Sequence, residues 1–327
     1  MTPDFWRGRR VFLTGHTGFK GTWLTEWLTI LGAQVTGYAL PDHDVRDLVS
    51  LRAAMTGTEP EVVLHLAAQA LVRASYEDPV TTFSTNVLGS VHVLEAVRAT
   101  PSVRVAIMVT SDKCYANSGD AHPFREDDPL GGHDPYSSSK AGAELAIGAY
   151  RRSFFALPHS PRVISVRAGN VIGGGDWSSD RLVPDLMRAF REGKRAQIRY
   201  PEATRPWQFV LDALHGYLLT AEHAFRGAEL PDAFNFGPDA REARTVRWLA
   251  DSIASRWGGD ASWHDPDETH PHEDPALALD SARHRQILGW TPCLDEESAA
   301  AWTTDWYKSA RVLTRDQIER FMEMIPT

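Results

Sequence analysis

The fold is decided by the stretch Val11-Phe12-Leu13-Thr14-Gly15-His16-Thr17-Gly18-Phe19-Lys20-Gly21, in which an apolar run stops at a cluster of glycines. The apolar run predicts a buried strand that ends at Thr14. Apolar residues then recur at helical spacing until Gly32, which predicts a helix, and residues 34–38 predict a second strand. This strand–turn–helix–strand order is typical of the first unit of a doubly wound parallel sheet.

Three glycines in this stretch have the spacing of a dinucleotide-binding loop. Gly15 permits a tight turn, Gly18 lets the backbone approach a pyrophosphate, and Gly21 allows the helix to pack closely on the strand. An ordinary strand-to-helix turn is the alternative interpretation. The strand before the glycines and the helix after them favour the dinucleotide site.

The end of the second strand bears on which dinucleotide is bound. An acidic residue usually stands there to bind the adenosine ribose, but residues 35–40 contain none. Asp42 or Asp44 could take this role, and the stretch offers no arginine for a 2′-phosphate. The sequence therefore favours NAD over NADP, although only weakly.

Strands and helices continue to alternate up to Asn170, beyond which the sequence changes in character. We expect an α/β fold, a doubly wound parallel sheet (Rossmann-like) with a smaller α/β substrate-binding lobe. The dinucleotide-binding domain is predicted to span residues 1–170, with 207–232 crossing back to it, and the second lobe 171–206 and 233–327. Further expected elements are strands at Val62–Leu66, Val103–Thr110, Arg162–Arg167, Ala196–Arg199 and Ala233–Phe236, helices at Val80–Ala99, Pro135–Phe155, Leu182–Glu192, Ser298–Lys308 and Asp316–Met324, a helix within Trp207–Phe225, and a surface loop at Asp260–Pro275.

Composition and charge exclude several classes of protein. The 327 residues are 43% hydrophobic and 24% charged, with 34 basic and 43 acidic side chains and a net charge of −9. No basic stretch could follow a nucleic-acid backbone, and no apolar run reaches the ~20 residues that span a bilayer. The two cysteines have no metal-ligand spacing, and the first residues hold no apolar signal core. We therefore expect a cytoplasmic enzyme with neither a nucleic-acid nor a membrane partner.

Tyr136 and Lys140 form a candidate catalytic pair. They are one helical turn apart, so both side chains should lie on the same helix face. A neighbouring ammonium stabilises a phenolate, so Lys140 should lower the pKa of Tyr136 and make it a general base. Ser111 follows a predicted strand and could hydrogen-bond the same substrate hydroxyl. A surface pair on a helix is the alternative for Tyr-x-x-x-Lys alone.

The order of glycine loop, strand-end serine and Tyr-x-x-x-Lys resembles the extended short-chain dehydrogenase/reductase family. Leu66-Ala67-Ala68 after the third strand and Asn86 in the long helix also match that family. The resemblance covers essentially the whole chain and implies NAD as cofactor. It implies a cofactor site formed by Gly15, Thr17, Gly18, Phe19, Lys20, Asp44, Val45, Leu66, Ala67, Ala68, Asn86, Tyr136 and Lys140.

Ser111-Asp112-Lys113 resembles, within this family, the sugar-nucleotide 4,6-dehydratases, and Cys114-Tyr115 after it the branch that acts on CDP-glucose. The strings at 14–21, 167–177, 205–208 and 270–273 match the same branch. The resemblance implies conversion of CDP-glucose to CDP-4-keto-6-deoxyglucose by oxidation at C4, loss of water across C5 and C6, and return of hydride to C6. An epimerase, a dehydratase for another nucleotide and a non-catalytic dinucleotide sensor are the alternatives.

Roles follow for the catalytic residues under this resemblance. Tyr136, helped by Lys140 and Ser111, would take the proton of the C4 hydroxyl. Asp112 would protonate the departing C6 hydroxyl, which requires a raised pKa. Lys113 would remove the C5 proton where relatives use Glu, which requires a neutral amine, or else it has a structural role.

The resemblance also suggests how substrate and partners bind. The second lobe would be the sugar-nucleotide-binding lobe, and the helices Val80–Ala99 and Pro135–Phe155 would form a homodimer interface. The chain departs from the dehydratase pattern after Leu40, where a longer segment usually covers the adenosine, and this could weaken cofactor retention. The cluster His264, His270 and His272 is interpreted as a structured loop, so no metal is predicted. The predicted substrate-binding residues are Gln69, Asn170, Arg181, Arg205 and His272.

Overall fold

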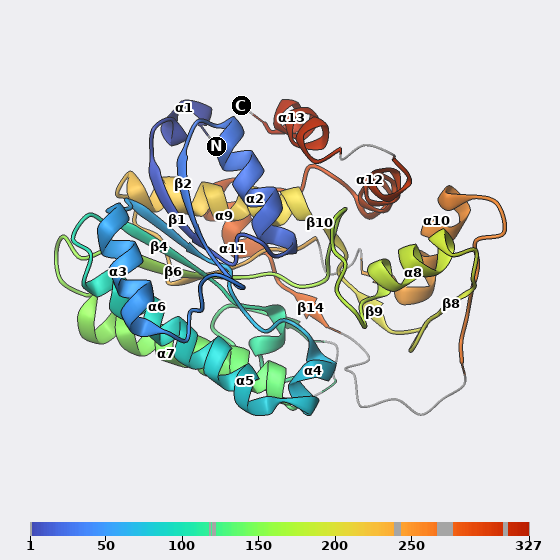
Figure 1. The fold of residues 1–327 in the computed structure, drawn as a ribbon, viewed down its shortest axis with the longest axis horizontal. Coiled ribbons are helices and arrows are strands. Elements are labelled where there is room, and N and C mark those ends of the chain that lie inside the picture. Colours follow the sequence, from blue (N-terminus) through green and yellow to red (C-terminus); the bar gives the residue numbers. More distant parts are fainter. Residues whose placement is uncertain are drawn as a thin grey trace.

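A six-stranded parallel sheet with helices on both faces forms the centre of the molecule in a computed structural model (Figure 1). This arrangement confirms the predicted doubly wound fold. The structure describes residues 2–117, 119, 122–238, 243–266, 277–309 and 313–326. The sheet strands are β1 (Arg10–Thr14), β2 (Gln34–Tyr38), β3 (Val62–His65), β4 (Val105–Val109), β6 (Arg162–Arg167) and β11 (Ala233–Asn235).

The strand order places a ligand-binding crevice at the middle of the sheet. The strands run β11-β6-β4-β3-β1-β2, so β1 lies between β2 and β3. The chain extends the sheet in one direction with β2 and in the other from β3 onward. Ligands of open α/β sheets bind at the carboxyl ends of the strands where this order reverses.

Alternate residues of each strand point to opposite faces and build two separate hydrophobic cores. Val11 and Leu13 of β1 belong to a cluster with side chains of α2 (Phe19–Ile30) and α9 (Val210–Phe225). Phe12, between them, belongs to a cluster with side chains of α3 (Leu48–Thr58) and α6 (Gly89–Arg98). This explains why the strand sequences are continuously apolar.

Helix α9 is buried along nearly its whole length. All its residues except His223 are buried, as expected for a helix that packs on several sides. It packs on the sheet and on α2, while α11 (Ala282–Leu288) packs on α9 and β11. The other face carries α7 (Pro135–Phe154) beside α6 (Figure 1).

A smaller lobe lies beside the carboxyl end of the sheet (Figure 1). It contains α8 (Leu182–Arg191) and α10 (Val246–Trp257), which pack on each other, and α10 also packs on α12 (Glu296–Lys308). The C-terminal helix α13 (Thr314–Met324) returns to α2. Short strand pairs join these parts: β7 (Val171–Ile172) with β10 (Gln208–Phe209), β8 (Ala196–Gln197) with β13 (Trp263–His264), β9 (Thr204–Arg205) with β12 (Arg244–Thr245), and β5 (Pro123–Phe124) with β14 (Ala278–Leu279).

Two sequence predictions need correction. The single helix expected over Val80–Ala99 is divided into α5 (Pro79–Phe83), a π-helical segment (Ser84–Leu88) and α6. The segment expected to be a surface loop, Asp260–Pro275, contains β13, and its residues from 267 onward lie outside the described residues. Helices α3, α4 (Val72–Glu77), α10 and α11 and the short α1 (Pro3–Trp6) were not predicted.

Candidate active site

A cavity of about 1220 Å³ opens at the carboxyl ends of the central strands. It is lined by residues that directly follow β1, β3, β4 and β6, and on its other side by residues of the smaller lobe. Fifteen predicted site residues line it together, and they come from distant parts of the sequence. These are Gly15, Gly18, Phe19, Lys20, Leu66, Ala68, Gln69, Ser111, Asp112, Lys113, Tyr136, Lys140, Asn170, Arg181 and Arg205.

The glycine loop has the geometry that a dinucleotide pyrophosphate requires. Gly15 has φ +73°, and a Cβ there would lie 2.7 Å from the backbone nitrogen of Ala67. A Cβ on Gly21 would lie 2.0 Å from the carbonyl oxygen of Gly15. Gly18 is the N-cap of α2 and offers no side chain to the first N–H groups of the helix. These N–H groups and the helix dipole therefore fit a phosphate.

Lys20 places a titratable amine in the cavity beside the catalytic residues. Its Nζ donates to the hydroxyl of Tyr217 on α9 at 3.3 Å. Burial, together with the charges of Arg181 and Lys140, lowers the pKa of Lys20 to about 7. Tyr217 was not predicted as a site neighbour, because it lies on α9, and no sequence pattern connects that helix with the glycine loop.

Tyr136 and Lys140 share the cavity-facing side of α7, but their electrostatics differ from the expectation. Burial raises the pKa of Tyr136 to about 12, and the Ser111 hydroxyl and Arg181 offset only part of this effect. Burial lowers the pKa of Lys140 to about 8. Lys140 is not among the groups that act most strongly on Tyr136, and the loss of solvation on burial is the largest influence on the phenol. The phenol of Tyr136 is therefore protonated near neutral pH.

The carboxylate of Asp112, just after the end of β4, is held in one position by hydrogen bonds and close packing. Its Oδ1 accepts from the Ser111 hydroxyl at 3.0 Å, and its Oδ2 accepts from the Asn170 side-chain amide at 3.3 Å. A Cβ on Gly169 would lie only 1.6 Å from Oδ2, so only glycine leaves room for the carboxylate. Burial raises the pKa of Asp112, although Lys113, Ser111, Lys20 and Arg205 act against this. A raised pKa is what the predicted role as an acid requires.

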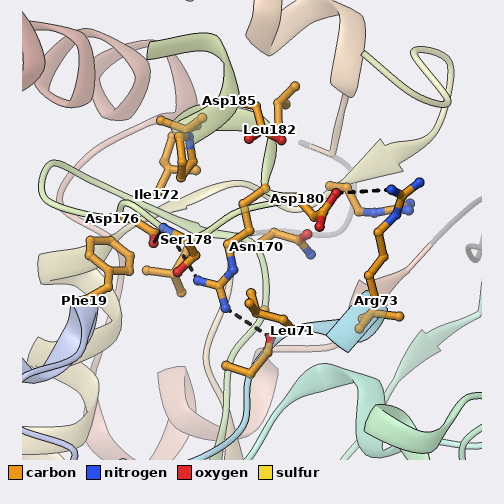
Figure 2. A pocket seen from close by; sticks show the side chains of 18 of the residues that line it. Phe19, Leu71, Arg73, Asn170, Ile172, Asp176, Ser178, Asp180, Leu182 and Asp185 are labelled. Atoms are coloured by element: carbon orange, nitrogen blue, oxygen red, sulfur yellow. Dashed lines mark hydrogen bonds and ion pairs between the residues drawn. The ribbon is translucent and has the colours of Figure 1, made fainter. Parts of the chain in front are cut away.

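Arginines of both lobes surround the outer part of the cavity. Arg181 pairs with Asp176 at 3.0 Å and donates to the Ala70 carbonyl at 3.1 Å. Arg73 on α4 points toward Asp180 and pairs with it at 3.2 Å (Figure 2). Arg199 also pairs with Asp180, at 3.0 Å. Arg73 and Arg199 were missed at the sequence level because nothing local distinguishes them from solvated surface arginines.

Several residues predicted for the cofactor site do not line the cavity. The Asn86 side-chain amide fixes the backbone of Gln69, which lines the cavity. Its Oδ1 accepts from the Gln69 backbone N–H, and its Nδ2 donates to the Gln69 carbonyl and to Ser139. The Asp44 carboxylate pairs with Arg46, and Val45 is buried in the second core. Thr17 donates to the Leu40 carbonyl, and Ala67 packs behind Gly15. His272, which was predicted to bind the substrate, lies outside the described residues.

The described part of the chain contains no group of three or more His, Cys, Asp or Glu side chains placed to hold a metal ion. None of its described helices is both long enough and apolar enough to cross a membrane. Cys114 and Cys293 are both free.

A glycine loop at a helix N-terminus, with Ser, Tyr and Lys side chains around one cavity, defines a dinucleotide-dependent enzyme of the short-chain dehydrogenase/reductase class. Residues 11–237 match the model of the NAD dependent epimerase/dehydratase family, and the chain belongs to this family. It is 44% identical to CDP-glucose 4,6-dehydratase of Salmonella typhimurium (strain LT2), over 94% of this chain and 93% of that protein. It is 27% identical to UDP-glucose 4-epimerase of Mycolicibacterium smegmatis, over 92% of this chain and 99% of that protein.

Solved structures support the same fold. The crystal structure of DesIV, a dTDP-glucose 4,6-dehydratase from Streptomyces venezuelae with NAD and TYD bound, matches with a TM-score of 0.80 and 22% identity, over 92% of this chain and 98% of that chain. The Thermus thermophilus UDP-glucose 4-epimerase complex with NAD matches with a TM-score of 0.81 and 24% identity, over 92% of this chain and 100% of that chain.

Proposed function

We propose that this protein is an NAD-dependent 4,6-dehydratase that converts CDP-glucose to CDP-4-keto-6-deoxyglucose and water. The observation that carries this proposal is the buried Asp112, which lies next to Ser111 and shares one cavity with Tyr136 and Lys140. An oxidation at C4 alone has no need of such an acid, whereas an elimination does. The 44% identity to a relative named CDP-glucose 4,6-dehydratase supports the choice of substrate.

The cofactor would bind at the glycine loop, with its pyrophosphate at the N-terminus of α2. When bound, NAD would accept a hydride from C4 of the sugar and return it to C6. Tyr136 would receive the proton of the C4 hydroxyl while it gives up its own, because the phenol is protonated near neutral pH, and Ser111 would orient that hydroxyl. Lys140 lies one turn further along α7, lines the same cavity, and would bind the ribose of the nicotinamide half.

Elimination then requires an acid and a base on the two carbons next to the new ketone. The ketone acidifies the C5 proton, which Lys113 removes, and Asp112 protonates the leaving C6 hydroxyl. The raised pKa of Asp112 suits an acid. Lys113 also lines the cavity, as the role of base requires.

The sugar nucleotide would extend from Tyr136 toward the smaller lobe. Arg181, Arg205 and Asn170 are our candidates for binding the diphosphate, since guanidinium groups bind phosphate oxygens in pairs. Gln69 is our candidate for a contact with the sugar because it lines the cavity, where Thr82 and Leu71 fix its amide. We assign residues 1–170 and 207–232 to cofactor binding, and 171–206 and 233–327 to substrate binding.

A direct test is to incubate the purified protein with NAD and, separately, with CDP-, UDP-, dTDP- and GDP-glucose. A 4-keto-6-deoxy sugar absorbs in the ultraviolet in alkali, so product formation is measured by absorbance and confirmed by mass spectrometry as loss of water. CDP-glucose should give product fastest. An isomerised sugar without loss of water would instead indicate an epimerase, and the absence of any product would favour a non-catalytic sensor.

We further propose that the protein is a cytoplasmic homodimer. Large apolar side chains are exposed on neighbouring helices α5 and α7, among them Val80 (77%), Leu145 (63%) and Phe154 (44%). Two free cysteines suit a reducing compartment. Sedimentation should show a dimer at micromolar concentration, and Leu145→Glu should shift it toward monomer. A wild-type monomer would contradict the proposal.

A further inference from the structure

A complete catalytic cycle moves one proton across the active site, if the proposed function is correct. Oxidation at C4 gives the hydroxyl proton to Tyr136, and elimination takes a proton from Asp112 to form water. Without a connection, each turnover would leave Tyr136 with a proton too many and Asp112 with one too few. Tyr136, Ser111 and Asp112 are only 8%, 5% and 2% exposed, so exchange with bulk water is restricted.

We propose that the Ser111 hydroxyl conducts this proton, so that the proton released by the C4 hydroxyl becomes the proton that Asp112 donates to the leaving C6 hydroxyl. Ser111 donates to Asp112 Oδ1 at 3.0 Å, which is the required direction. Its oxygen accepts from the backbone N–H of Lys113 at 3.2 Å. A hydroxyl has one donor and two acceptor sites, so one acceptor site is left for the Tyr136 phenol. Tyr136 and Ser111 line the same cavity, and Ser111 acts on the phenol as a hydrogen-bonding neighbour.

The local backbone holds this connection in place. Ser111 is the N-cap of the short 3₁₀ turn Asp112–Cys114, which fixes the serine and the carboxylate relative to each other. Asn170 and the close approach of Gly169 prevent the carboxylate from turning away. Lys20 and Tyr217 lie nearby, but no hydrogen bond joins Tyr217 to Asp112 or Tyr136 among the described residues. Ser111, which is bonded to Asp112 and neighbours the Tyr136 phenol, is therefore the residue placed to join the two.

The steps balance without any exchange with solvent. As hydride leaves C4, the O4 proton passes to Tyr136, the Tyr136 proton to Ser111, and the Ser111 proton to Asp112. The base then removes the C5 proton, the C6–O bond breaks, and Asp112 protonates the departing oxygen to give water. Hydride returns to C6, and the base returns its proton to C5. Tyr136, Ser111, Asp112 and the base are then all in their starting states.

If this path operates, Asp112 is needed already in the oxidation step. An acid that acted only in the elimination would not affect the rate of oxidation. The side chain in Asp112→Asn cannot accept the proton. Reduced nicotinamide, measured by its absorbance in a single turnover with CDP-glucose, should therefore form at least about 100-fold more slowly than wild-type kcat. Wild-type kcat is a lower limit for the wild-type oxidation rate. Ser111→Thr and Ser111→Val are a matched pair with and without a hydroxyl. Ser111→Thr should stay within about tenfold of wild type, whereas Ser111→Val should resemble Asp112→Asn.

The double variant decides between conduction and simple orientation of the substrate. If Ser111 and Asp112 act in series, Ser111→Val combined with Asp112→Asn oxidises C4 no more slowly than either variant alone. Independent roles would multiply the two losses and overturn the proposal, as would Asp112→Asn forming reduced nicotinamide at wild-type kcat or faster. Ser252→Ala, which removes a remote serine hydroxyl bonded to Trp248, is the control for folding. Tryptophan quenching by NAD should be unchanged in all variants.

The proposed function can fail separately. A wild-type protein that forms no product from CDP-glucose overturns that function together with the proton path. A wild-type protein that forms product, with Asp112→Asn still oxidising C4 rapidly, overturns the proton path alone.

Discussion

Gly169 is the position where the smallest substitution should have the largest effect on activity. A Cβ at this position would lie 1.6 Å from Asp112 Oδ2, whereas such contacts are essentially never closer than 3.0 Å. The carboxylate in Gly169→Ala must therefore move by at least the difference, 1.4 Å. A misplacement of about 1 Å in an active site can cost about 100-fold in rate. We expect kcat with CDP-glucose to fall by about 100-fold or more.

The same clash should also destabilise the fold, and a second substitution should relieve it. Overpacking at a buried site costs about 1–3 kcal/mol, which would appear as a lower midpoint of urea unfolding. In an Asp112→Ala background the added methyl group has room, so Gly169→Ala should change neither the unfolding midpoint nor the residual activity. The control is Gly57→Ala on α3, where a Cβ meets nothing within 4 Å and should be neutral or stabilising.

A Gly169→Ala variant with wild-type kcat would contradict this prediction. A loss of stability that persisted undiminished in the Asp112→Ala background would contradict it too, because the clash with the carboxylate could not then be the cause.

Three further predictions follow from other groups. Lys113→Met should abolish water loss but still allow C4 oxidation, seen as reduced nicotinamide that persists; unchanged turnover would exclude Lys113 as the C5 base. Lys20 has a pKa of about 7 and is therefore charged below neutral pH, so the anionic dinucleotide should bind more tightly at about pH 6 than at about pH 8. A fluorescence titration of Lys20→Met should show that this pH dependence is lost. His65, His215 and His284 have folded-state pKa values near 3, below the usual 6.5, because of burial. Their contribution to stability is complete above pH 6.5 and is lost as the pH falls toward 3, at about 1.4 kcal/mol per pH unit for each histidine; urea unfolding of His65→Gln should show a correspondingly shallower loss.

Local patterns were enough to predict the sheet and the inner part of the site. The central strands are continuous apolar runs, and the glycine loop has its own spacing, so both could be found from the sequence. Ser111 was found from its place after a strand, Tyr136 and Lys140 from their spacing of one helical turn, and Asp112 from the family resemblance. These residues share one cavity in the structure.

Features that depend on distant contacts could not be predicted. Helix α3 was missed because it buries only Leu51 and Met55, which is a weak periodic signal. Tyr217 and Arg73 enter the site region from helices far along the chain from the residues they meet. The expected influence of Lys140 on Tyr136 was wrong in strength, because spacing along a helix gives proximity but says nothing of how far burial removes solvent.

The burial of α9 has a consequence for any attempt to exchange specificity between relatives. This helix lies between the two segments that we assign to the substrate, and its side chains belong to the same core as the central strands and as Leu249 of α10. A chimera that takes its substrate-binding lobe from a relative would need both segments from that relative. The side chains of both segments would still have to pack against α9 of the host. The fold therefore favours piecemeal evolution of specificity, by point changes at the cavity surface, over recombination of intact modules.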